Sequence, residues 1–144
     1  MEFKQISSLE EFNAVKEPLF KLCLEYQKAL NNHPNASFKV LAHDFANCLK
    51  APDCMLYLIE KDGGPKGFIV YKVLQNSVEP VLFCLHLYCP KGGRPIWEKT
   101  RIIAEELGIS EVQGFYFNES RYRVYRQWAK AHNTEQCEMI RIFL

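Results

Sequence analysis

Apolar residues in the first third of the chain recur at helical spacing. The alternation at Phe3–Ile6 first predicts a short strand. Ser8 and Glu11 then fit a capping box, and the apolar positions that follow repeat every three or four residues, which predicts a helix. Pro18 lies inside this run, and we expect it to kink the helix or divide it in two. Ser37 fits the N-cap of a second helix with its own apolar face.

The middle of the chain is rich in β-branched and aromatic residues and predicts three strands. The first two are Cys54–Glu60 and Lys66–Leu74, joined by a hairpin-type turn at Lys61–Pro65. The third is Val78–Cys89, a nearly continuous apolar run. Such a run is typical of a central strand that is covered on both faces.

The last third of the chain alternates between helical and strand patterns. A helix is predicted from Pro95–Leu107, and Gly108 would end it. Strands are predicted at Val112–Phe117 and Glu138–Leu144, with a helix at Glu119–His132 between them. The order of elements is therefore β-α-α-β-β-β-α-β-α-β, which predicts an α+β fold in which helices flank a mixed central sheet.

Length and composition agree with an ordinary globular protein. The 144 residues predict a single domain that spans residues 1–144. The net charge of +1 provides no field over the whole chain that would attract nucleic acid or a membrane surface. The N-terminal sequence "MEFKQISSLEEF" does not have the pattern of a signal peptide, and no apolar run approaches the roughly 20 residues of a membrane span. We therefore expect a cytoplasmic protein with no nucleic-acid or membrane partner.

The six cysteines do not have the spacing of a metal or redox site. No two of them form a C-x-x-C motif. Cys84 and Cys89 are five residues apart in a predicted strand, so their side chains should point to opposite faces of the sheet. We expect reduced and mostly buried thiols and no metal.

The segment between the third central strand and the next helix contains two glycines and two cations. Its residues are Lys91, Gly92, Gly93 and Arg94, and Pro95 follows them. Glycines allow the backbone to approach an anion closely, and the N–H groups of Lys91 to Ile96 at the start of the helix would be free to face a phosphate. The alternative is a tight connection in which the glycines serve only the backbone geometry. The segment alone leaves both interpretations open.

In its order of elements and in several motifs, the whole chain resembles the GCN5-related N-acetyltransferase (GNAT) superfamily. The hairpin "DGGPKGFIVY" looks like the second and third strands of that family, and Val78–Cys89 looks like the fourth. The segment Lys91–Ile109 is similar to the family's pyrophosphate loop and its helix, with Gly93 on the last glycine of the loop. The loop is degenerate, because the initial Arg or Gln of the family pattern is missing and Pro95 is unusual there.

The segment "NESRYRVYRQW" is similar to the family's segment after the fifth strand. Asn118 and Tyr125 match the family positions, whereas the Gly-Phe pair that normally follows is lost. The resemblance implies acetyl-CoA as co-substrate and direct attack of an amine on the thioester. It assigns the role of general acid to Tyr125. Core packing beside Trp128 is the alternative for this tyrosine.

The resemblance also implies where CoA would be bound. Main-chain groups of Leu87 and Cys89 would contact the pantetheine arm, and residues Lys91 to Arg94 would contact the pyrophosphate. Asn118 and Arg121 are further candidates, because Arg121 lies four residues before Tyr125 and hence on the same helical face. The alternative for Arg121 is a solvated helix surface.

The attacking amine must lose a proton, and the family often uses a carboxylate or an imidazole on the fourth strand for this step. Glu79 and His86 are the candidates, and their separation of seven residues places them on opposite faces. We favour His86, because it is closer to the loop and its pKa suits a base. The alternative for His86 is a hydrogen-bonded histidine in the core.

The expected function is transfer of an acetyl or other acyl group from CoA to an amine that the sequence does not identify. The acceptor could be a small molecule or a protein. The alternative is a catalytically inactive GNAT-like domain that acts as a binding or structural module. A homodimer is compatible with the sequence, which leaves the oligomeric state open.

Overall fold

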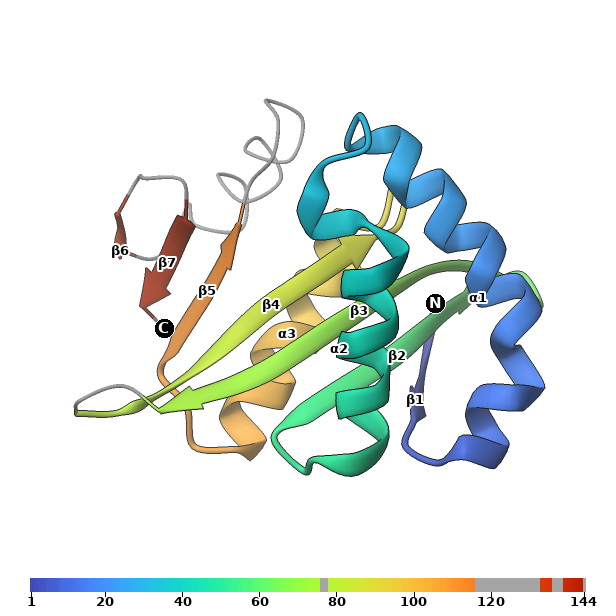
Figure 1. Ribbon diagram of the computed structural model, residues 1–144. Coiled ribbons are helices and arrows are strands. Elements are labelled where there is room, and N and C mark those ends of the chain that lie inside the picture. Colours follow the sequence, from blue (N-terminus) through green and yellow to red (C-terminus); the bar gives the residue numbers. More distant parts are fainter. Residues whose placement is uncertain (76–77, 116–132, 136–138, 144) are drawn as a thin grey trace. The chain divides into compact units, whose positions relative to one another are not determined.

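The computed structural model describes residues 1–75, 78–115, 133–135 and 139–143 (Figure 1). The chain divides into two units. The first consists of Met1–Tyr71 together with His86–Pro90, and the second consists of Lys72–Leu85 together with Lys91–Leu144. Two long strands run from one unit into the other, so each unit contains part of both.

The first unit begins with an antiparallel pair of strands. Strand β1 (Glu2–Ile6) pairs with β2 (Cys54–Lys61). A tight turn then leads into β3 (Gly64–Gln75). Both central residues of the turn have a left-handed backbone, with φ of 54° at Asp62 and 77° at Gly63. Positive φ at both positions is the geometry of the turn that matches the twist of a hairpin, and it confirms the hairpin predicted from the sequence.

Helix α1 (Leu9–Ala29) begins as the sequence predicted. The Oγ of Ser8 accepts a hydrogen bond of 3.1 Å from the backbone N–H of Glu11. The Glu11 carboxylate accepts one of 3.2 Å from the backbone N–H of Ser7, one residue earlier than in the standard capping box. The division expected at Pro18 is wrong, because α1 runs through this residue as one helix. Its buried face continues on both sides of the proline, so packing outweighs the lost backbone hydrogen bond.

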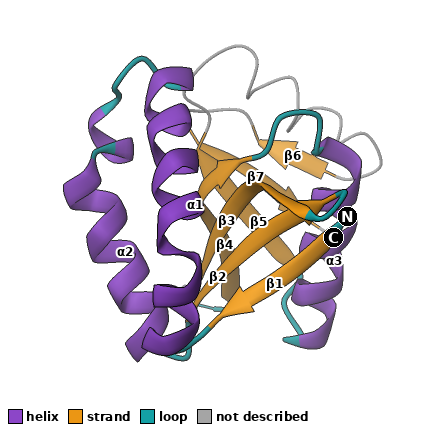
Figure 2. Ribbon diagram, turned by 90° about the vertical axis from the view of Figure 1, so that its right-hand side faces the viewer, coloured by secondary structure: helices purple, strands orange, loops and turns teal. Residues whose placement is uncertain are grey.

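A short 3-10 helix (Pro34–Ala36) and then α2 (Phe38–Lys50) follow α1. The Oγ of Ser37 caps α2 by accepting a hydrogen bond of 3.3 Å from the N–H of Val40, as predicted. Helices α1 and α2 lie side by side over one face of the strands of the first unit (Figure 2). None of the helices in the described part of the chain combines the length and the apolar character that a membrane crossing requires.

The second unit contains a parallel pair of strands. Strand β4 (Pro80–Tyr88) pairs in parallel with β5 (Glu111–Phe115), and Leu82 lies opposite Val112. Helix α3 (Gly93–Glu106) connects these two strands. Gly108 has φ of 67°, and the N–H of Ile109 donates to the Ala104 carbonyl at 2.8 Å, which confirms the glycine stop.

The strand order of the sheet is β1-β2-β3-β4-β5-β7-β6, with β7 at Met139–Phe143 and β6 at Asn133–Glu135. Strand β7 is antiparallel to both β5 and β6. Parallel and antiparallel pairs thus coexist, and the predicted α+β fold with a mixed sheet is confirmed. Strand β6 was not predicted. The helix predicted at Glu119–His132 lies outside the described residues.

Candidate functional site

The connection between β4 and α3 differs in two respects from the sequence prediction. Helix α3 begins at Gly93, two residues before the predicted start at Pro95, and Gly92 is its N-cap. The left-handed residue of the loop is Lys91, with φ of 61°, whereas Gly92 has φ of −95°. The loop therefore does not need Gly92 for a positive φ. Gly92 itself is buried.

The start of α3 offers fewer backbone donors than expected. The N–H of Ile96 donates to the Gly92 carbonyl at 3.1 Å, so the expectation that this group is free is wrong. Pro95 has no N–H at all. Lys91 and Arg94 are both exposed, and the Nε of Arg94 is 3.8 Å from the Glu98 carboxylate. Two accessible cations at a helix start favour an anion electrostatically, although Glu98 competes for Arg94.

The end of β4 belongs to the first unit and is held close to β3 by Gly67. A Cβ atom added to Gly67 would lie 2.2 Å from the carbonyl oxygen of Tyr88 and 2.6 Å from the Cβ of Cys89. Leu87 is buried and Cys89 is half-buried. The backbone proposed to contact pantetheine therefore has a fixed position that depends on a glycine. Gly67 was not among the site residues predicted from the sequence.

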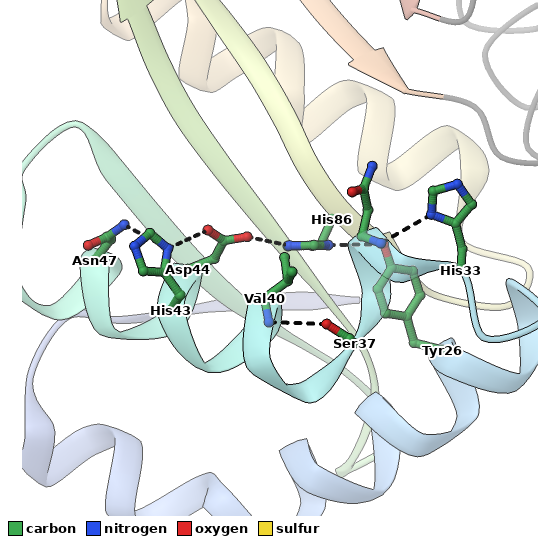
Figure 3. Close-up of polar contacts among 9 residues, drawn as sticks. Tyr26, His33, Ser37, Val40, His43, Asp44, Asn47 and His86 are labelled. Atoms are coloured by element: carbon green, nitrogen blue, oxygen red, sulfur yellow. Dashed lines mark hydrogen bonds and ion pairs between the residues drawn. The ribbon is translucent and has the colours of Figure 1, made fainter.

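His86 is at the centre of a chain of polar contacts in the first unit (Figure 3). Its Nδ1 is 3.1 Å from the hydroxyl of Tyr26 on α1, and its Nε2 is 2.6 Å from Oδ2 of Asp44 on α2. The His86 side chain is only 3% exposed. The buried and hydrogen-bonded state was one of the two alternatives for this residue. Its role as a base stays a prediction.

Asp44 connects this buried histidine to the surface. Its side chain is 16% exposed, and its Oδ1 is 3.4 Å from Nδ1 of His43, whose side chain is 74% exposed. Burial raises the pKa of Asp44, but the hydrogen bond to His86, the charge of His86 and the contacts with His43 outweigh it. The pKa of Asp44 therefore lies below its ordinary value, and Asp44 is an ionised carboxylate at neutral pH.

A pH titration of stability should reveal this pair. A lowered pKa in the folded state means that the stability contributed by ionised Asp44 is present above the ordinary pKa of 3.8 and is lost as the pH falls through the lower value of the folded chain. We expect Asp44→Asn to be less stable than wild type at neutral pH, and the difference to shrink below about pH 4. Urea unfolding of both proteins across this range measures the difference. An equal difference at every pH would contradict the ionised pair.

Two of the cysteines, Cys23 and Cys48, are unsuited to nucleophilic catalysis. Burial raises the pKa of the Cys23 thiol to about 12. The pKa of the Cys48 thiol is also raised to about 12. Burial is the main cause, and the neighbouring Cys54 is a second, smaller cause. Thiols with such values are not ionised at neutral pH and are poor nucleophiles. Within the described residues, no group of three or more histidines, cysteines and carboxylates could hold a metal ion.

An apolar groove of about 670 Å³ lies between α1 and α2. Its aromatic lining consists of Phe12, Phe20, Phe38 and Phe45. The rings of Phe20 and Phe38 are stacked with centroids 5.1 Å apart. None of Tyr26, Asp44 and His86 lines this groove, so it is separate from the polar chain.

Three of the residues that the sequence assigned to the site lie outside the described residues: Asn118, Arg121 and Tyr125. Their assignments stay predictions. In the first unit, His86, Leu87 and Cys89 lie at or next to the end of β4. In the second unit, Lys91 to Arg94 lie at the start of α3.

No protein-family model and no curated protein matches the sequence. Solved structures do match the fold along almost the whole chain. The PaiA N-acetyltransferase from Thermoplasma acidophilum, solved in complex with coenzyme A, has a TM-score of 0.68 and 16% sequence identity, and the match covers 100% of both chains. A predicted acetyltransferase from Clostridium acetobutylicum, solved with acetyl-CoA, has a TM-score of 0.68 and 12% identity over 95% of this chain and 94% of the other.

A third similar structure is the ribosomal-protein-alanine N-acetyltransferase from Brucella melitensis biovar Abortus 2308. Its TM-score is 0.64 at 17% identity, over 95% of this chain and 97% of that one. Likeness at such low identity concerns the fold. The chain therefore has the GNAT acetyltransferase fold, and the resemblance found in the sequence is confirmed at this level.

Proposed function

We propose that this chain is an N-acyltransferase that moves an acetyl or other acyl group from CoA to an amine. The observation that carries the proposal is the match to the CoA-bound and acetyl-CoA-bound acetyltransferases over 94% or more of every chain compared. The parallel pair β4–β5, with α3 and its cationic loop between the two strands, supports it from the chain itself.

The residues at the end of β4 would hold the acyl donor. When bound, acetyl-CoA supplies the thioester carbonyl that the amine attacks. The main-chain groups of Leu87 and Cys89 would contact the pantetheine arm, and Gly67 keeps this segment in place. Fixing donor and amine in line is mainly a proximity effect, and such effects account for about 7–11 kcal/mol of a barrier in well-oriented reactions.

The cations next to α3 would hold the pyrophosphate. Lys91 and Arg94 are exposed, and both lie next to the positive end of the helix dipole. The ion pair of Arg94 with Glu98, at 3.8 Å, is long and solvent-exposed, so a phosphate could displace it at little cost. Asn118 and Arg121 are the further candidates for contacts with CoA.

Two proton transfers complete the reaction. Tyr125 would donate a proton to the thiolate that leaves, since a phenol is a competent acid for a thiolate in contact with it. His86 would accept a proton from the amine. Both ring nitrogens of His86 already have partners, so the proton must reach the ring through one of them.

The test is release of free thiol from acetyl-CoA by the purified chain, with a panel of primary amines and amine-bearing peptides. Amine-dependent thiol release, with a matching acetylated product in mass spectra, would support the proposal. Binding of acetyl-CoA without turnover on any amine would overturn the catalytic role. That outcome would favour the inactive binding module that the sequence left open.

A further inference from the structure

The apolar groove between α1 and α2 is built from residues of the first unit alone. Both helices contribute residues three or four positions apart, a spacing that places side chains on one helical face. The volume of about 670 Å³ lies within the roughly 300–1,000 Å³ that small-molecule sites of proteins occupy. The groove is therefore large enough to hold a ligand.

The floor of the groove offers a ligand mainly apolar contacts. Its buried residues, each 6% exposed or less, are Leu19, Cys23, Leu41 and Phe45. The ring of Phe45 packs edge-on against Phe68 of β3, with the ring centroids 5.8 Å apart. Cys23 is the one floor residue with a heteroatom in its side chain, and its thiol stays protonated at neutral pH because burial raises the pKa to about 12. The floor is thus suited to binding and not to chemistry.

The mouth of the groove leaves two aromatic side chains in contact with water. Phe20 is 54% exposed and Phe38 is 41% exposed. Their stacked rings are almost parallel, with an angle of 4° between the planes. Single exposed apolar residues need no explanation, but an exposed aromatic pair next to an apolar hollow is typical of an interaction site. A ligand that covered both rings would remove this apolar surface from water.

The charged residues that line the groove have a net positive charge. They are Lys16, Glu17 and Lys21, all of them on α1 and all exposed. Within the part of the chain that the structure describes, neither lysine forms an ion pair. The apolar stem of a lysine can lie along a groove while its ammonium group stays in water. Two lysines against one glutamate therefore favour a ligand with an apolar body and one anionic end.

We propose that the apolar groove binds a free single-chain amphiphile with an anionic head group, of which a fatty acid is the simplest case. The apolar chain lies on the buried floor between the two helices, and the head group lies beside Lys16 and Lys21. None of the described residues assigned to the acyl transfer lines this groove. The site is separate from that reaction, and its test does not depend on it.

Two other occupants fit the groove less well. A stable interface with a second copy of the chain takes roughly 20–30 residues from each partner, which is more than line this groove. A flat membrane surface would contact the exposed rings of Phe20 and Phe38 but would not reach Leu41, which is 1% exposed. A single apolar chain can contact both the rings and the floor.

Calorimetry with octanoate, decanoate and dodecanoate, each kept below the concentration at which it forms micelles, tests the proposal. We expect one molecule to bind per chain, with a dissociation constant that falls about fourfold for each added methylene until the groove is full. Dodecyltrimethylammonium has the same chain and a cationic head group, and it should bind more weakly than dodecanoate. No saturable binding of dodecanoate, or equal binding of the two head groups, would overturn the proposal.

A bulky substitution locates the chain in the groove. Ala42 lines the groove at an exposed position, so Ala42→Trp should fill the groove and abolish dodecanoate binding without unfolding the chain. Ala14→Trp is the matched control, because it adds the same ring at an exposed position of α1 that does not line the groove, and it should bind like wild type. Urea unfolding shows whether both variants are folded. Equal binding by the two folded variants would place the ligand elsewhere and overturn the proposal.

A charge substitution locates the head group. Lys16→Gln combined with Lys21→Gln should weaken dodecanoate binding about 2–30-fold, the loss expected for two exposed ion pairs. The control combines Lys28→Gln with Lys50→Gln, which changes the net charge equally at exposed positions outside the groove. Equal losses in the two double variants would contradict the assigned position of the head group.

The remaining outcomes identify the other occupants. Binding to vesicles of anionic phospholipid without binding of free dodecanoate would make the groove a membrane contact. A dimer in sedimentation that Ala42→Trp dissociates, again without binding of dodecanoate, would make it an interface between copies of the chain. Either result would overturn the proposal and leave the proposed acyl transfer untouched.

Discussion

Replacing Tyr125 with phenylalanine should lower turnover about 10²–10⁴-fold, the usual loss when a general acid is removed. The substitution keeps the aromatic ring and removes only the hydroxyl. The leaving thiolate would then depart without a proton donor. The affinity for acetyl-CoA should barely change, because the hydroxyl would act only on the reacting sulfur.

Turnover is measured by free thiol release and affinity by calorimetry. Tyr122→Phe is the matched control, because it removes the same hydroxyl three residues earlier, and we expect it to behave like wild type. Turnover of Tyr125→Phe at the wild-type rate would remove Tyr125 from the mechanism. The alternative from the sequence, core packing beside Trp128, would then account for this tyrosine.

Replacing Gly67 with alanine should destabilise the fold by about 1–3 kcal/mol, the usual cost of overpacking. The added Cβ would lie 2.2 Å from the Tyr88 carbonyl oxygen and 2.6 Å from the Cβ of Cys89. Both distances are far shorter than a van der Waals contact. A backbone oxygen cannot rotate away as a side chain can, so the end of β4 must shift.

Urea unfolding measures this loss, and the same chain offers a control. Gly64 also lies in β3, but a Cβ there would meet nothing within 4 Å. Gly64→Ala should therefore change stability by less than about 0.5 kcal/mol. A shift of Tyr88 and Cys89 should also weaken acetyl-CoA binding in Gly67→Ala alone. Equal stability and equal affinity of the two variants would contradict the role given to Gly67.

Most of the elements could be predicted because local patterns and packing agree. Contacts within a few residues begin α1 at Ser8, begin α2 at Ser37 and end α3 at Gly108. These boundaries are therefore visible in the sequence. Pro18 shows the opposite case. The buried face of α1 continues past it, and tertiary packing of that face overrides the local preference for a break.

The geometry of the β4–α3 connection could not be predicted. A pair of glycines indicates backbone freedom, yet Lys91 takes the left-handed conformation and Gly92 does not. Strand β6 is only three residues long and depends on its pairing with β7, so it has no local pattern of its own. The pattern of residue types therefore indicated neither feature.

The sequence pointed to His86 but missed its partners. One signal was present, since Asp44 lies three residues after Leu41 and four before Cys48, in the middle of the buried face of α2. A carboxylate on an apolar stripe usually has a buried partner. The partner itself could not be identified, because 42 residues separate Asp44 from His86 along the chain.

Binding of acetyl-CoA to the wild-type chain tests the proposed function most directly. Calorimetry should show saturable binding of one acetyl-CoA per chain. Acetyl-CoA at 100 times its dissociation constant should raise the free energy of unfolding by about 2.7 kcal/mol. No heat of binding and no gain in stability at millimolar acetyl-CoA would contradict the proposal that this fold still serves acyl transfer from CoA.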